Sequence, residues 1–290
     1  MENQSVLSKY KRQPKIYLTL PSGGKFYDQN PTEKTGSGEL PIYSMTARDE
    51  LAIKTPDALM SGEATVSVIK SCCPLINDPW KMPAVDLDAV LIAIRIATYG
   101  ETLEMEVPIR YMEDEQMKFA SETTQIDLRQ ILDNMQGKEW PTQFQHNDLT
   151  FTLRPLNYKE TTEFFMATFE NQRLASMMQD TKINDAEKMK AFREGFKKLS
   201  QMTMDMVCKH VVSIATPDGE ESNPVAIKEF FNSTDKETFV AVQDRIEQIK
   251  KMWTPPPTKF QVPQEYVDKG SDATIEVPMV FDNSSFFVSK

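Results

Sequence analysis

The 290-residue sequence predicts an α+β fold in which a mixed α/β domain precedes a helical hairpin or small bundle and an extended C-terminal tail. Strand-like alternation and capped helices mix before residue 157, whereas helical spacing of apolar residues dominates residues 157–252. The remaining residues begin near three consecutive prolines and have no helical period. We therefore expect a flexible arm at 1–13, a mixed domain at 14–156, a helical domain at 157–252 and a Pro-rich extended tail at 253–290.

The mixed domain begins with a strand pattern at residues 14–20, which ends at the turn Pro21-Ser22-Gly23-Gly24. The turn continues into Lys25, and a Gly-Gly-Lys sequence suggests phosphate binding. A P-loop, however, needs four residues between its first glycine and the Gly-Lys pair, followed by Ser or Thr. Phe26 follows the lysine instead. A turn between two strands is therefore favoured.

Helices are expected next, the first with Thr46 as N-cap and Asp49 three residues later. Further helices are predicted at 63–72 and 86–98. The second of these has its apolar residues on one face, and Arg95 lies off that face, so we expect Arg95 in solvent.

Two strands are predicted after these helices, at Glu101–Arg110 and at Leu149–Leu153, because apolar and polar residues alternate there. The acidic run Glu113–Glu115 follows the first strand. Consecutive acids splay their side chains, so a solvated loop is favoured over a cation site.

Helical periodicity is clearest in the second half. Apolar residues there step by three and four positions, which favours antiparallel packing of helices. Methionines are frequent, and among them Met177 and Met178 are candidates for partner binding, since methionine adapts to irregular surfaces. A plain core is favoured over a docking patch. The stripes are Met189, Phe192, Phe196, Leu199, Thr203, Met206 and His210, then Phe239, Val242, Ile246, Ile249 and Trp253.

Composition limits the function classes. The net charge of −10 disfavours nucleic-acid binding, and no apolar run is long enough to span a membrane. Three cysteines, two of them adjacent, favour reduced thiols in a cytosol. With two histidines, no His-Glu-x-x-His and no Gly-x-Ser-x-Gly, the sequence predicts a non-catalytic protein that needs neither metal nor cofactor.

Several N-terminal segments, in order and spacing, resemble the baseplate hub and hub assembly family of T-even-type contractile-tailed bacteriophages. They are Ile16–Tyr27 (IYLTLPSGGKFY), Met45–Leu51 (MTARDEL), Thr55–Gly62 (TPDALMSG), Val68–Pro74 (VIKSCCP) and Ile94–Gly100 (IRIATYG). The resemblance implies a structural or assembly role in the hub, in the virion tail baseplate, after assembly in the host cytoplasm. Other hub or tail proteins would be its partners, and a homo-oligomer is possible.

The tail supplies two further candidates for partner binding, Phe286 and Phe287, because an extended segment can fill a pocket on a neighbour. A tail folded back onto its own domain is an equal alternative. The alternative function is a nucleotide- or nucleic-acid-binding accessory factor, suggested by Gly23-Gly24-Lys25 and the basic residues between Lys9 and Lys15.

Overall fold

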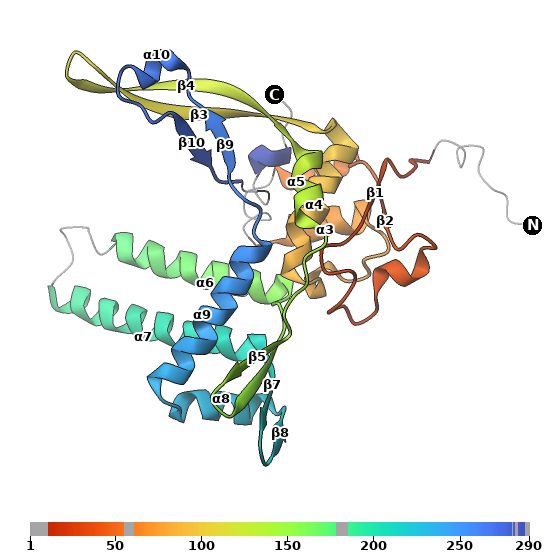
Figure 1. The fold of residues 1–290 in the computed structure, drawn as a ribbon, viewed down its shortest axis with the longest axis vertical. Coiled ribbons are helices and arrows are strands. Elements are labelled where there is room, and N and C mark those ends of the chain that lie inside the picture. The colour runs from red at the N-terminus through yellow and green to blue at the C-terminus, as the bar shows by residue number, and fades with distance from the viewer. Residues whose placement is uncertain (1–10, 55–60, 178–184, 280, 282–283, 288–290) are drawn as a thin grey trace, which may run out of the picture.

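The computed structural model describes residues 11–54, 61–177, 185–279, 281 and 284–287. Within these ranges the chain combines helices with four antiparallel sheets, three of two strands and one of four (Figure 1). The predicted α+β class is confirmed.

Elements before residue 136 pack around one long helix, α4 (Ala84–Tyr99), which is buried along most of its length. The predicted cap at Thr46 is confirmed, because Thr46 and Asp49 form a reciprocal capping box. Gly100, at a φ of 93°, follows the last residue of α4. The other elements are β1 (Ile16–Leu18), η2 (Pro31–Lys34), β2 (Leu40–Ile42), α1 (Ala47–Ile53), α3 (Glu63–Cys72), η3 (Pro79–Lys81), β3 (Thr102–Glu113), β4 (Gln116–Asp127) and α5 (Leu128–Met135).

The later part contains the predicted helical hairpin, formed by α6 and α7, together with a sheet that the sequence did not predict. Residues 157–252 were expected to form a helical domain, but this range also contains the strands β7 and β8, and β7 pairs with β6. The β-branched run that begins at Val211 favours a strand. The elements are β5 (Gln143–His146), β6 (Leu149–Leu153), α6 (Tyr158–Met177), α7 (Asp185–His210), β7 (Val211–Thr216), β8 (Gly219–Glu221), α8 (Pro224–Ser233) and α9 (Lys236–Trp253).

The structure has two hydrophobic cores, and the second one starts at Trp140, whereas the sequence suggested a change at residue 157. Tyr158 and the tail residues Phe281, Phe286 and Phe287 still belong to the first core. Phe151 of β6 therefore belongs with the buried face of α9 in the second core. The cores meet at the start of α4, where Ala84 donates to the Leu156 carbonyl at 2.8 Å and Tyr158 donates to the Met82 carbonyl at 2.8 Å. These backbone bonds fix the start of α6 beside the start of α4.

The tail is less extended than expected, because β9 (Thr258–Gln261) and β10 (Thr274–Val277) pair, with α10 (Gln264–Val267) between them. This unit packs on β3: Met112 donates to the Lys269 carbonyl at 2.8 Å, and the Tyr111 and Tyr266 rings lie 5.2 Å apart. The tail then returns to the first core and ends, within the described residues, in η4 (Ser284–Phe287).

Arg95 is buried at 5% exposure, so the expectation that it lies in solvent is wrong. The returning tail covers it: Arg95 Nη1 donates to the Phe286 carbonyl at 2.6 Å, and the guanidinium packs against the Tyr99 and Phe286 rings. A helix pattern cannot reveal a neighbour that lies 191 residues away in sequence.

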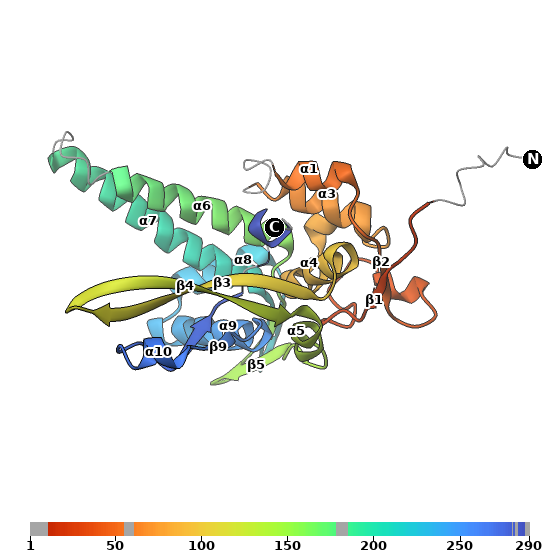
Figure 2. The same ribbon diagram turned by 90° about the horizontal axis from the view of Figure 1, so that it is seen from above.

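Two hairpins extend from the body toward the same side, the α6–α7 pair and the β3–β4 pair (Figures 1 and 2). The β3–β4 strands pair over twelve residues each, and their turn is Asp114-Glu115, with φ values of 54° and 61°. Positive φ at both central residues is typical of a type I′ hairpin turn.

Replacing Phe286 with Ala should lower the free energy of unfolding by about 3 kcal/mol, because the ring is buried and its loss leaves a cavity. Thermal and denaturant unfolding measure the change. Leu51→Ala, on an exposed face of α1, is the control and should change stability by less than about 0.5 kcal/mol. Equal stability of the two variants would show that the tail does not belong to the core.

Candidate interaction surfaces

The loop between β1 and β2 is fixed by one buried carboxylate, Asp86 in the first turn of α4. Its oxygens accept from the Ser22 amide at 2.8 Å, the Ser22 hydroxyl at 2.6 Å and the Tyr27 hydroxyl at 2.9 Å. These three bonds satisfy a side chain that is fully shielded from solvent. The loop is thereby held against the main helix of the first core.

The two glycines of this loop adopt the left-handed backbone conformation that its turn requires, which agrees with the predicted turn. Gly23 and Gly24 have φ values of 64° and 78°, and a Cβ at Gly24 would lie 2.0 Å from Asn30 Oδ1. Phosphate cradles place such a loop before an α-helix, but the 3₁₀ helix η2 follows here. Lys25 is exposed beside the turn. The feature that suggested nucleotide binding is therefore explained by packing.

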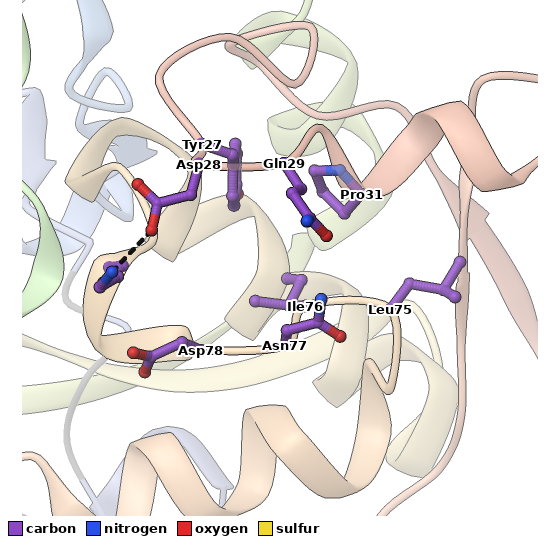
Figure 3. A pocket seen from close by; sticks show the side chains of 9 residues that line it. Tyr27, Asp28, Gln29, Pro31, Leu75, Ile76, Asn77 and Asp78 are labelled. Carbon is purple, nitrogen blue, oxygen red and sulfur yellow. Dashed lines mark hydrogen bonds and ion pairs between the residues drawn. The ribbon is translucent and has the colours of Figure 1, made fainter.

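A pocket of about 260 Å³ adjoins the loop, between Tyr27–Pro31 and Leu75–Lys81 (Figure 3). Two of its lining residues form an ion pair, Lys81 Nζ with Asp28 Oδ2 at 2.6 Å. Asp78 accepts from the Trp80 amide at the start of η3. Both acids thus have structural partners, and the pocket brings together no nucleophile and base.

Burial raises the pKa of Asp86 from 3.8 to about 6, although its three hydrogen bonds oppose the shift. Burial likewise raises the pKa of Cys72 to about 12 and lowers the pKa of His210 to about 4. A thiol of high pKa is a poor nucleophile. The described residues contain no group of three His, Cys, Asp or Glu side chains placed to hold a metal ion.

The apolar stripe of α7 is only partly a core, which corrects the preference for a plain core. Near its C-terminal end Val207 and His210 are buried beside α9. Toward the other end Met189, Phe196 and Leu199 are 56%, 65% and 41% exposed. On α6, Phe165 and Phe169 are also exposed. The helical hairpin therefore presents large apolar side chains to solvent.

A second apolar patch lies near the turn of the β3–β4 hairpin. Met112 and Met117 are paired across the strands, and Phe119 follows on the same face. All three are exposed, Phe119 to 71%. β4 and this patch were not predicted. The sequence signal for them is the alternation of Met117 and Phe119 with Lys118.

Two of the four partner-binding candidates have side chains that the structure describes, and neither is exposed. Phe286 and Phe287 are 3% and 6% exposed in the first core, which agrees with the alternative of a tail folded back on its own domain. Met177 is the last residue of α6, and Met178 lies outside the described residues.

Residues 13–265 match a protein family described as T4 bacteriophage base plate protein. The chain belongs to this family. The match spans both hairpins, the second core and all of the first core except its tail residues, so it covers more than the N-terminal segments that suggested the resemblance. No curated protein and no solved structure matches the chain. No helix among the described residues has the length and apolar character needed to cross a membrane.

The raised pKa of Asp86 makes stability depend on pH in an unusual direction. Between about pH 4 and 6 the folded chain holds a proton on Asp86 that the unfolded chain has released, so stability falls as pH rises. A pKa difference of about two corresponds to roughly 3 kcal/mol. Relative to Asp86→Asn, the wild-type protein should lose up to that amount between about pH 4 and 7.

Urea unfolding of both proteins across this pH range measures the difference. His210 contributes the opposite trend, because its lowered pKa makes acid destabilising. It is present in both proteins, so its contribution cancels in the difference. Parallel stability curves for the two proteins would show that Asp86 ionises at its ordinary pKa.

Proposed function

We propose that this baseplate protein is a structural or assembly component of the hub, acting through protein–protein contacts and without catalysis. The family match over residues 13–265 supports the baseplate role. The N-terminal segments that resemble hub proteins support the finer assignment. The Ser22–Tyr27 segment of that resemblance is the loop that Asp86 fixes, so the motif has a structural basis.

The exposed rings of the helical hairpin support a role in binding other hub or tail proteins. Large exposed apolar groups that recur along one helix are typical of interaction surfaces. The location we propose is the virion tail baseplate, after assembly in the host cytoplasm.

Disrupting the gene in the phage that carries it should leave tails without normal baseplates, because an assembly component would be missing. Electron microscopy of infected-cell lysates measures this, and the wild-type chain supplied in trans should restore the baseplates. Mass spectrometry of purified virions then separates a permanent component from an assembly factor. Normal baseplates and full phage yield without the gene would contradict the hub role.

Within the same complementation assay, Phe196→Glu should reduce phage yield while leaving the melting temperature nearly unchanged. The ring is 65% exposed, so a charge there costs the fold little but opposes burial in an interface. Val225→Glu, at an equally exposed apolar residue of α8, is the matched control. The same yield from both variants would exclude the α7 stripe as a docking surface.

A further inference from the structure

The β3–β4 hairpin has one protected edge and one open edge. Met112 donates its amide to Lys269 rather than to β4, so it points away from the partner strand. Backbone groups alternate in direction along a strand. Pro108, four residues earlier in β3, therefore also faces outward and has no amide to offer. The outer edge of β3 is thus covered at one position and lacks a donor at another.

The outer edge of β4 is neither covered by another segment of the described chain nor interrupted by a proline. By the same register, Met117, Phe119, Ser121 and Thr123 direct their amides and carbonyls outward, and these groups have no backbone partner among the described residues. The strand runs for twelve residues without a proline or a register shift. A long, regular, unpaired edge is a template for another strand.

We propose that β4 pairs antiparallel with β4 of a second copy of this chain, about a two-fold axis at Ala120, to form a four-stranded sheet. This proposal does not depend on the hub role. An isologous contact requires a self-complementary strand, and β4 is self-complementary in this register. Ala120 meets its own counterpart, and Phe119 lies opposite Ser121 of the other copy.

Charge complementarity selects both the partner and the register. In this pairing Lys118 of each copy lies opposite Glu122 of the other, so two cross-strand ion pairs form. Both side chains are only partly buried in the single chain. Lys118 pairs there with Glu113 at 2.7 Å, and Glu122 accepts from the Tyr266 hydroxyl at 3.3 Å, so the dimer would exchange these contacts for the cross-strand pairs. Shifting the axis to Ser121 would place Glu122 opposite Ala120 and would lose both pairs. The chain carries a net charge of −10, but residues 116–124 contain one Lys and one Glu, so this strand avoids the general repulsion between copies.

The mass in solution tests the association. Sedimentation should show the full-length chain moving from 33.2 kDa toward twice that mass as concentration rises. Ser121→Pro should abolish the shift, because it removes an outward amide. It should also leave the hairpin intact, since Pro108 already occupies the position directly opposite in β3. Thr123→Ala, which keeps its amide, is the control and should still associate.

A cysteine variant tests the register independently. Two residues directly opposite at a non-hydrogen-bonded position have Cα atoms about 4.5 Å apart, which a disulfide can bridge. Mild oxidation of Ala120→Cys should therefore give a covalent dimer at a yield well above the wild-type background from Cys208. Ser121→Cys, displaced from its own counterpart, should cross-link less.

A mass of 33.2 kDa at the highest soluble concentration, with no cross-link in Ala120→Cys, would overturn the proposal. So would association that persists in a folded Ser121→Pro variant. Preferential cross-linking of Ser121→Cys would overturn the register and the ion pairs that define it. If Ser121→Pro does not fold, as judged by circular dichroism, the cross-linking comparison alone decides.

Discussion

The Asp86 carboxylate is the interaction that organises the first core. It accepts hydrogen bonds from both ends of the Ser22–Tyr27 loop. It lies in the first turn of α4, where the helix N-terminus favours an anion. Removing the carboxylate would leave two hydroxyls and one amide to find other partners in a dry site. Its raised pKa shows that burial outweighs this support, so the loop is held at some cost in stability.

The chain around the start of α4 also positions the second core. Ala84 and Met82 bond to the chain around Leu156, and Trp80 stacks on Tyr158 with ring centroids 5.4 Å apart. The helical hairpin therefore starts from a fixed point. Asn157 and Glu160 form a reciprocal cap there, and Arg154 holds Glu160 at 2.8 Å. The direction in which α6 leaves the body is thus set by contacts that begin at α4.

Features of this fold that depend on residues close together in sequence could be predicted. Features that depend on contacts between distant residues could not. Thr46 and Asp49 lie three residues apart, so their capping box could be read directly from sequence. The environment of Arg95 could not, because its partner Phe286 is 191 residues away. The Asn157–Glu160 cap has the same three-residue spacing, but it was not predicted. Exposure of Phe196 could not be predicted either, since helical spacing is the same whether or not a neighbouring helix covers the stripe.

The two hairpins leave their apolar residues open for different physical reasons. Around Phe196, in the interior of α7, the backbone groups bond within the helix, so exposed rings there offer only side-chain burial to a partner. In β4 the backbone edge itself is unsatisfied, and Phe119 adds a ring beside it. Contacts through the first surface tolerate changes in partner orientation, whereas a strand pairing fixes distance and register. The helical hairpin is therefore suited to recognise other proteins, and β4 to hold copies of this chain in a fixed geometry.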